Sequence, residues 1–526
     1  MESNDDLGKF PSYVLDGAPS ARPRCLVELR VQELCNALMI KPDWWNKIER
    51  EEVAQRWEAE AREQGASSEA YKIVMEKLNF LNQLRDGDIR PAPVDGVYES
   101  DERIVAEVRD RLLSAVKIFE DSPDKDWHPG SDQQVLDLVH PSLFCLVKGV
   151  SPVVSEAEMD MDWSQLLGHG EPVTDEFFRD ESRDRSDEAF DFNRFKACRY
   201  TVSSKFQWLP SEVVIDDCGN AKFDSYVNNV HPVDHAHVVQ VLEKILSRFI
   251  PMFEKVLTHM KNPWPNLIEV ETEWYPPTPN FDEEEDYRAT EQWEETRPVI
   301  EPSLPASFPV PEGFRDRVEL RGRRLQVITK LANIVLTPAK PSYGGGAWHV
   351  EGMENEHIVA SGIYYYASEN ITESRLSFRQ AVQEPDYEQD DQRGVEAVYG
   401  IVDEDPLNQS KGYVLCTSGR CVCFPNTLQH RVEPFHLSDT RKPGVRKILV
   451  FFLVDPTRRV WSTRRVPPQQ EAWYRGKKSQ SGGHPERPMT IEQARKYRDD
   501  LMRERSRFVK KHNETVFERS FSLCEH

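Results

Sequence analysis

Three side chains in the second half of the chain have the types and the spacing of a metal site. His349 and Glu351 are separated by one residue, and His430 comes from a distant segment. Because residues i and i+2 of a strand point to the same face, His349 and Glu351 can reach one ion from adjacent backbone. Two imidazoles and one carboxylate leave half of an octahedral metal's coordination sites open, as non-haem Fe(II) oxygenases require. These residues therefore predict a metal-dependent enzyme.

Arg446 begins a run of β-branched and aromatic residues that predicts a buried strand. A buried guanidinium is costly unless it holds an anion in its fork, and a dicarboxylate co-substrate is such an anion. Arg441 is the competing residue, but it lies in the polar segment 438–443, which is typical of a loop. We therefore assign the co-substrate to Arg446, as a hypothesis.

Strands and tight turns are expected to position these residues. Residues 325–336 and 358–366 have strand patterns, and the glycines at 344–346 bend the chain just before the first histidine. The segment 424–426 predicts a turn, after which His430 opens another strand. The ligands are thus expected to lie on one β-rich domain.

Helices are predicted at both ends of the chain. Thr490 and Gln493 form a capping box for a final helix over residues 494–511, which we expect to pack as a lid or brace. In the amino-terminal region apolar residues recur at helical spacing over residues 26–39, 70–84 and 104–119.

The middle of the chain alternates ordered and irregular segments. Residues 213–227 predict a β-hairpin around an Asp-Cys-Gly-Asn turn, and Asp234 is expected to cap a helix that continues through Phe249. Prolines alternate with acidic residues over 275–311, so no regular structure is expected there.

Other potential ligands have simpler explanations. His231, His235 and His237 lack a fixed fourth ligand, and the last two diverge on a helix, so capping and packing are favoured. Cys421 and Cys423 are two apart in a strand-like segment. Their spacing is not that of a zinc site, and they are expected to be small buried residues on one face.

Composition excludes several classes of protein. No apolar run is long enough for a membrane span, and the nine unclustered cysteines favour reduced thiols in the cytoplasm, with the nucleus as an open alternative. The net charge of −23 disfavours nucleic-acid binding. Residues 441–520 carry 21 Lys plus Arg against 9 Asp plus Glu, and we expect this basic tail to fold back on the acidic remainder.

Several motifs resemble a known family. The chain is similar to the domain-of-unknown-function 4246 family, found mainly in fungi, and more distantly to the Fe(II)/2-oxoglutarate-dependent oxygenases. The resemblance implies an α+β protein with a double-stranded β-helix (jelly-roll, cupin-like) core, a large helical amino-terminal region and a carboxy-terminal helix. The motifs that carry the closer resemblance are residues 348–353, 363–366, 374–380, 428–435 and 466–470.

The resemblance also implies how the site is used. It implies that the Fe(II) ligands are His349, Glu351 and His430, and that the iron binds 2-oxoglutarate and O₂. Arg446 would pair with the far carboxylate of the co-substrate. Many relatives carry a serine at the same-face position that Ile448 occupies here, so Tyr343 or Tyr365 is expected to supply the missing hydroxyl.

Three functions are compatible with these sequence features. The leading one is a dioxygenase that oxidises, most often by hydroxylation, a small organic molecule, with fungal secondary metabolism as a setting. The second is a hydroxylase or demethylase of protein side chains. The third is an inactive β-helix that serves as a scaffold. The substrate and the oligomeric state are not predicted.

The domain boundaries follow from the shifts in composition and pattern. We predict a helical region (1–158), an acidic insertion (159–191), an α+β block packed on the core (192–274), a Pro-rich acidic linker (275–314), the oxygenase core (315–470) and a basic helical segment (471–526).

Overall fold

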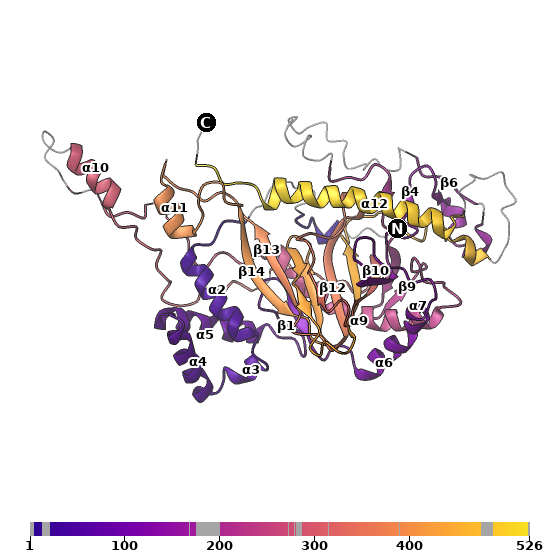
Figure 1. The fold of residues 1–526 in the computed structure, drawn as a ribbon, viewed down its shortest axis with the longest axis horizontal. Coiled ribbons are helices and arrows are strands. Elements are labelled where there is room, and N and C mark those ends of the chain that lie inside the picture. Colours follow the sequence, from indigo (N-terminus) through magenta and orange to yellow (C-terminus); the bar gives the residue numbers. More distant parts are fainter. Residues whose placement is uncertain are drawn as a thin grey trace.

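Two antiparallel β-sheets with a shared core between them form the centre of the protein, and helices cover the outside (Figure 1). This computed structural model describes residues 5–12, 21–167, 169–174, 200–271, 273–277, 279, 287–313, 315–388, 390–474 and 488–523. The combination of helices with antiparallel sheets confirms the predicted mixed α and β class.

The larger sheet has nine strands. Their order is β1-β2-β15-β12-β18-β10-β8-β9, and β3 also pairs with β10. The strands are β1 (Arg90–Pro91), β2 (Tyr98–Ser100), β3 (Val135–Val139), β8 (Ser211–Ile215), β9 (Ala221–Phe223), β10 (Arg324–Leu336), β12 (Ile358–Glu369), β15 (Cys421–Pro425) and β18 (Gly444–Val454). The two predicted long strands and the predicted hairpin, β8–β9, are confirmed.

The smaller sheet lies opposite and has the order β14-β13-β16. A short pair, β11 with β17, adds further antiparallel structure beside it. These strands are β11 (Ser342–Tyr343), β13 (Arg375–Ala381), β14 (Asn408–Leu415), β16 (Gln429–Val432) and β17 (Phe435–His436). Two minor pairs are β4 (Leu146–Val147) with β7 (Phe206–Gln207) and β5 (Pro152–Val153) with β6 (Glu171–Pro172).

Alternate residues of β18 face opposite sides of the larger sheet. Phe451 belongs to the core cluster that contains Phe249 of the covering helix, whereas Phe452 belongs to the cluster that contains Phe378 of the smaller sheet. Arg446 shares the register of Phe452, so its side chain lies on the inner side, between the two sheets. Cys421 and Cys423 are buried on the outer side, as predicted.

A long helix, α9 (Ala236–Lys261), packs on the outer face of the larger sheet against β12 and β15. The predicted helix through Phe249 is present, and it extends beyond the predicted range, past Pro251 to Lys261, because its apolar stripe stays buried for three further turns. Its amino-terminal cap is His235 rather than the predicted Asp234, and no side-chain hydrogen bond completes the cap.

Gly362 of β12 marks the closest approach of this helix to the sheet. A Cβ at this position would lie 2.6 Å from Cδ1 of Phe249 and 3.0 Å from Cζ of Phe253, and both phenyl rings are fully buried. We expect Gly362→Ala to lower the free energy of unfolding by about 1–3 kcal/mol through overpacking. Denaturant unfolding measures this; Gly313→Ala, which meets open space, should leave the midpoint unchanged. Equal midpoints for both variants would contradict the prediction.

The amino-terminal helices pack beside the sheets in two groups (Figure 1). They are α2 (Leu26–Met39), α3 (Trp44–Lys47), α4 (Glu51–Glu63), α5 (Ser68–Gln83), α6 (Ala106–Ala115) and α7 (Lys117–Glu120). The helix predicted over 26–39 is confirmed without change. The α4 helix was missed because its sequence is strongly polar and only Trp57 and Ala61 of it are buried.

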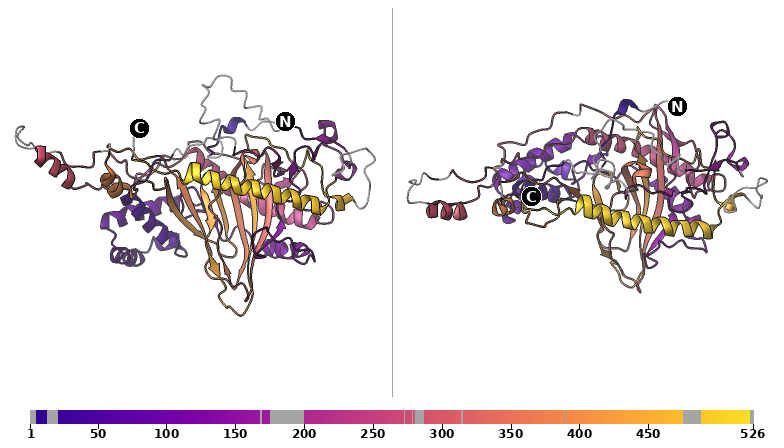
Figure 2. Two further views of the ribbon diagram at one scale, coloured as in Figure 1. Left: turned by 45° about the horizontal axis from the view of Figure 1, so that its top comes forward. Right: turned by 90° about the horizontal axis from the view of Figure 1, so that it is seen from above.

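The carboxy-terminal helix α12 (Ile491–His512) runs across the ends of strands of both sheets (Figures 1 and 2). Its predicted capping box is present. The remaining helices are α10 (Tyr287–Thr296), α11 (Gln392–Tyr399), the π-helix η8 (Asn513–Phe517) and the 3₁₀ helices η1 (Asp5–Leu7), η2 (Glu156–Glu158), η3 (Trp163–Gln165), η6 (Glu354–Glu356) and η7 (Glu471–Tyr474).

The stretch predicted to lack regular structure needs a correction. It contains α10, an amphipathic helix whose sequence has helical periodicity between the proline-rich parts. The acidic run at 282–286 and most of the predicted acidic insertion, 175–191, lie outside the described residues. Within the described ranges, no helix combines the length and the apolar character that crossing a bilayer requires.

Candidate metal centre

Backbone pairing holds the two segments that carry the predicted ligands together. His349 and His430 form an antiparallel bridge in which each N–H donates to the other's carbonyl oxygen, at 3.2 and 3.0 Å. Gly345 makes this approach possible: its φ is +88°, and a Cβ there would lie 2.9 Å from the carbonyl oxygen of Val432. The glycines before His349 thus serve close backbone approach.

The three predicted ligands converge. Nε2 of His349 lies 3.7 Å and Nε2 of His430 lies 3.3 Å from Oε1 of Glu351, and the two ring centroids are 4.5 Å apart. Nδ1 of His349 lies 2.8 Å from the carbonyl oxygen of Ala347, to which it can only donate. In the neutral ring, Nε2 of His349 therefore carries the lone pair with which it can bind a metal.

Asn426 fixes the backbone of Glu351. Its Oδ1 accepts from the Glu351 N–H at 2.8 Å, and its Nδ2 donates to the carbonyl oxygens of Glu351 and Ile358, both at 2.9 Å. The sequence predicted only a turn at this asparagine. Its position directly after β15 is the one signal that could have indicated a structural role, since asparagine often bonds nearby backbone at turns.

The charges of the three groups are strongly coupled. Burial would raise the pKa of Glu351, but hydrogen bonds from both imidazoles hold that pKa well below its usual range. Burial opposes the protonation of His349, yet the Glu351 carboxylate raises the pKa of this histidine above its usual value. Burial and the charge of His349 lower the pKa of His430. One ionised carboxylate thus shares a proton with two imidazoles, and a divalent cation can replace that proton.

The centre is closed on one side and open on the other. The side chain of His430 is 4% exposed and packs against the rings of Phe424 and Phe378, with centroids at 4.7 and 6.3 Å. The side chains of Glu351 and His349 are 16% and 35% exposed. A molecule that approaches the centre therefore comes from the side of His349.

Arg446 is buried, and its only hydrogen bond to another side chain among the described residues goes to a serine. It is 2% exposed, and Nη1 donates to Oγ of Ser374 at 2.7 Å. Its Nε has no hydrogen-bond partner, and no carboxylate of the described residues lies within ion-pair distance of the guanidinium. The rings of Tyr365 and Phe435 lie 5.5 and 5.3 Å from Cζ. Burying an uncompensated guanidinium is costly, so the position is suited to an anion.

The two predicted tyrosines lie near this arginine. The ring of Tyr365 lies beside the guanidinium of Arg446, and Tyr343 packs against Phe435 in a tilted arrangement with ring centroids 5.4 Å apart. Burial raises the pKa of both phenols, so both hydroxyls stay protonated. The hydroxyl that contacts Arg446 in the structure belongs to Ser374, at the start of β13, which the sequence alone did not single out.

The segment after α12 braces the residues next to the ligands. Asn513 of η8 donates to the carbonyl oxygen of Trp348 at 3.3 Å and accepts from Nε2 of Gln429 at 2.5 Å. The guanidinium groups of Arg379 and Arg431 lie 4.8 and 4.6 Å from the Trp348 ring centroid. Because Trp348 and Gln429 directly precede His349 and His430, this end of the chain holds the two predicted ligand histidines in place. The predicted brace thus acts through the π-helix.

Other imidazoles have structural surroundings. His231 is buried, accepts a hydrogen bond from the Asp234 N–H at 3.0 Å and packs against Trp473 with ring centroids 5.0 Å apart. His357 closes η6 in a left-handed conformation, and His436 is exposed on β17. In the described part of the chain, the remaining group of residues with metal-ligand types and spacing is His128, Asp137 and His140.

A separate cavity of about 1150 Å³ lies between α2, the end of α9 and the smaller sheet. Asp95 on its wall is shared by three cations, Arg24 at 2.9 Å, Lys77 at 3.2 Å and Lys411 at 3.7 Å. Burial and the neighbouring Arg24 lower the pKa of Lys411 to about 7. This network joins the amino-terminal helices to the sheets, and sequence patterns gave no sign of it.

We expect Asp95→Asn to destabilise the protein by about 3–5 kcal/mol at a pH below the pKa of Lys411, because it removes the carboxylate that the charged Arg24, Lys77 and Lys411 share. Denaturant unfolding monitored by circular dichroism measures the loss. Asp110→Asn is the matched control, since that side chain is 64% exposed and should change stability little. A loss below 1 kcal/mol for Asp95→Asn would contradict the assignment of this network.

Two family models match the chain. The first is described as "Protein of unknown function (DUF4246)" and matches residues 69–477, and the second is described as "Domain of unknown function DUF4246, N-terminal" and matches residues 2–60. Together they span most of the sequence. No curated protein matches the chain.

Several solved structures share distant similarity. The Fe(II)/(alpha)ketoglutarate-dependent dioxygenase TqaL is 12% identical over 67% of this chain and 90% of its own, with a TM-score of 0.21. A bsmA homolog from Methylobium petroleophilum PM1 is 10% identical over 25% of this chain, and IDO from Bacillus thuringiensis is 8% identical over 25%, both with TM-scores of 0.17. This chain spans only 42% and 46% of the last two.

Proposed function

The chain belongs to the DUF4246 family, and we propose that it is an Fe(II)- and 2-oxoglutarate-dependent dioxygenase that hydroxylates a small organic molecule. The observation that carries the proposal is the pairing of two sites on one inner surface. One is the convergent group His349, Glu351 and His430, and the other is the buried guanidinium of Arg446, which has no carboxylate partner among the described residues.

The donor set fits iron. Two neutral imidazole nitrogens and one carboxylate oxygen are the facial ligands that leave three coordination positions open for a chelating co-substrate and O₂. The separations of 3.3 and 3.7 Å between donor atoms are close to the roughly 3 Å expected for adjacent ligands of an octahedral ion with bonds near 2.1 Å. Small side-chain rotations would complete the site.

Arg446 fits the co-substrate. Its guanidinium can form two parallel hydrogen bonds with a carboxylate, and Ser374 can donate a third. The core cluster that contains Val450 and Phe452, on the same face of β18 as Arg446, also contains Phe424, whose ring packs on His430. A dicarboxylate that reaches from the metal into this core would therefore end at Arg446.

The strand arrangement supports the same reading. The larger sheet contains the run β15-β12-β18-β10, and the strands opposite it are β14-β13-β16 and the pair β11-β17. The chain thus crosses between the two sheets in the order typical of a double-stranded β-helix, and these strand pairs are antiparallel. We infer that these strands form such a core, with β1, β2, β3, β8 and β9 as additions to its larger sheet.

Each residue of the site has a task. Iron with 2-oxoglutarate and O₂ supplies the oxidation of an unactivated C–H bond, coupled to conversion of the co-substrate into succinate and CO₂. His349, Glu351 and His430 bind the metal, and Asn426 orients the backbone of Glu351.

The remaining residues of the site hold the co-substrate and keep water away. The aromatic rings against His430 exclude water from the closed side, which protects the oxidant from side reactions. Arg446 and Ser374 hold the far carboxylate. The substrate enters on the side of His349, which is the exposed side of the centre.

We propose an intracellular setting, because the described cysteines are all free and six of the seven are buried. Buried thiols react little, and the reducing interior of a cell keeps them from forming disulfides. The cytoplasm is the simplest compartment that provides Fe(II), 2-oxoglutarate and a reducing environment.

Anaerobic binding of Fe(II) and then 2-oxoglutarate tests the proposal. We expect a visible metal-to-ligand charge-transfer band when the keto acid chelates the iron, and slow succinate formation once O₂ is admitted. Iron-loaded protein that shows neither the band nor succinate would overturn the proposal and favour a scaffold without catalysis.

A further inference from the structure

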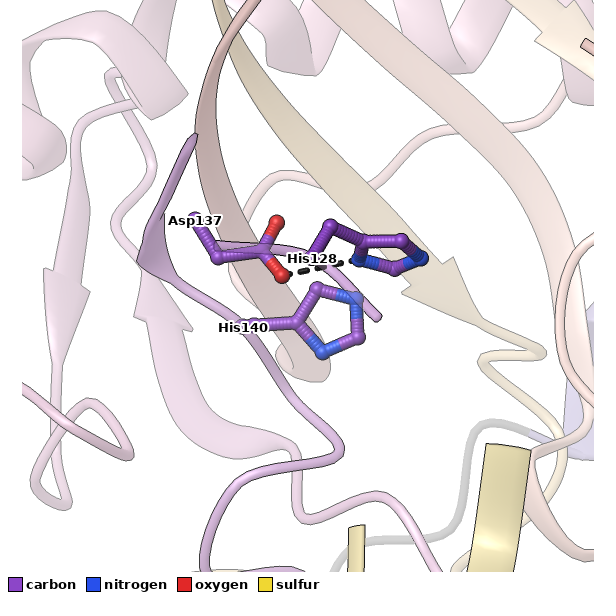
Figure 3. A group of neighbouring side chains, drawn as sticks. All are labelled: His128, Asp137 and His140. Carbon is purple, nitrogen blue, oxygen red and sulfur yellow. Dashed lines mark hydrogen bonds and ion pairs between the residues drawn. The ribbon is translucent and has the colours of Figure 1, made fainter. Parts of the chain in front are cut away.

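A second group of potential ligands lies at the edge of the larger sheet (Figure 3). Asp137 belongs to β3 and pairs with Ala332 of β10, and His140 directly follows β3. His128 lies on the segment that precedes β3 and runs antiparallel to it. The N–H of His128 donates to the carbonyl oxygen of Val135 at 2.9 Å. A single hairpin-like segment therefore brings all three side chains together.

The three side chains face one another. Nδ1 of His128 lies 2.8 Å from Oδ2 of Asp137, the two ring centroids are 5.2 Å apart, and one ligand atom from each residue lies within 4.8 Å of the others. Nδ1 of His140 accepts from the N–H of Ser142 at 3.2 Å, so the proton of the neutral ring lies on Nε2, and a metal bound to this ring would displace that proton or replace the hydrogen bond at Nδ1. Figure 3 shows the Asp137 carboxylate and both rings turned toward a common point.

The hydrogen bonds within the protein leave the Asp137 carboxylate incompletely satisfied. The residue is 4% exposed, and Oδ1 has no hydrogen-bond partner anywhere in the described ranges. An unpaired buried carboxylate oxygen costs about 1–3 kcal/mol or more. A cation held by both oxygens of Asp137 and by the two imidazoles would remove this cost.

We propose that His128, Asp137 and His140 form a second divalent-metal site, of the type that Zn(II) occupies. Imidazole nitrogen and carboxylate oxygen are common zinc ligands, and three of them leave the fourth tetrahedral position for water or an external ligand. Ligand atoms at zinc distances lie about 3.3 Å apart, so the 2.8 Å contact must open slightly and the longest separation must close. The site shares no residue with the first centre and does not depend on the proposed oxygenase activity.

Nearby positive charges should weaken the binding of a divalent cation at this second site. The positive charge of Lys330 on β10 lowers the pKa of both Asp137 and His140. The positive charge of Arg498 on α12 lowers the pKa of His140, but Arg498 is already paired with Asp126 at 2.5 Å. The Lys330 ammonium should therefore weaken binding of a dication. Replacing Lys330 by glutamine should tighten it several-fold, an effect that a merely structural His–Asp pair would not produce.

Zinc titration of the metal-free full chain tests the proposal, with isothermal calorimetry and elemental analysis as readouts. The background is His349→Ala, which disables the first centre, and one equivalent of Zn(II) should remain. Adding Asp137→Asn or His128→Gln should weaken this equivalent at least about 100-fold, since even changes to outer partners of metal ligands cost 10–100-fold. Adding Lys330→Gln should tighten it.

Two results would decide against the second metal site. Absence of saturable zinc binding in the His349→Ala protein would overturn the proposal, and so would full binding in a folded Asp137→Asn protein. His128→Gln guards against loss of folding, because that side chain is 26% exposed and circular dichroism can verify the fold. Failure of the oxygenase proposal would leave the zinc stoichiometry of this background unchanged, so the two proposals fail independently.

Discussion

His349→Ala is expected to abolish Fe(II) binding at micromolar concentrations and to reduce succinate formation at least about 100-fold. The variant removes the nitrogen that lies 3.7 Å from the Glu351 carboxylate and leaves two donors, too few to hold the ion against water. Because the side chain is 35% exposed, its loss should affect folding little. Anaerobic iron titration and succinate release measure the two effects.

His436→Ala is the matched control for this prediction. His436 is also an exposed histidine on the neighbouring strand β17, but it lies outside the convergent group. The control should retain iron and turnover. If His349→Ala kept both, or if the two variants lost them equally, His349 would not be a ligand.

Arg446→Gln is expected to raise the apparent KM for 2-oxoglutarate about 10- to 150-fold, which corresponds to the loss of about 1.5–3 kcal/mol of charge-assisted hydrogen bonding. The free energy of unfolding of the ligand-free protein should stay the same or rise, because the variant removes a buried charge that lacks a carboxylate partner among the described residues. A purely structural arginine would show the opposite pattern, with lower stability and an unchanged KM.

The competing arginine supplies the control. Arg441 has an 86% exposed side chain and pairs with Asp439 at 3.0 Å. Arg441→Gln should change neither the KM nor the stability, since exposed ion pairs contribute little. An equal rise in KM for both variants would point to a general effect of charge and would remove Arg446 from the site.

Much of the local structure could be predicted because local signals agree with the tertiary structure. The helix at 26–39, the capping box at Thr490 and the strand over 324–336 all follow from periodicity and from end signals. The end of α9 could not be predicted, because Pro251 and the cap residues compete with a buried stripe that only the sheet provides. The polar helix α4 likewise lacked the apolar stripe by which helices are found.

The candidate metal centre also has some features that the sequence predicted and others that it did not. The ligand types and the strand spacing of His349 and Glu351 are properties of the sequence, and so is the pattern in which Arg446 begins a strand. The partners that orient them come from elsewhere: Asn426 from the end of β15, Ser374 from the start of β13 and Asn513 from η8. The group of His128, Asp137 and His140 has no spacing that would identify it before folding.

Donor types, charge and periodicity are fixed residue by residue, so the candidate ligands and most of the helices and strands that carry them could be predicted from the amino-acid sequence. Which donors meet, which charges lack partners among the described residues and which side of the candidate centre is open depend on the fold. The physical reason is that strand register and helix packing, which set these distances, depend on contacts between residues that are far apart in the chain. Local sequence signals do not encode such contacts.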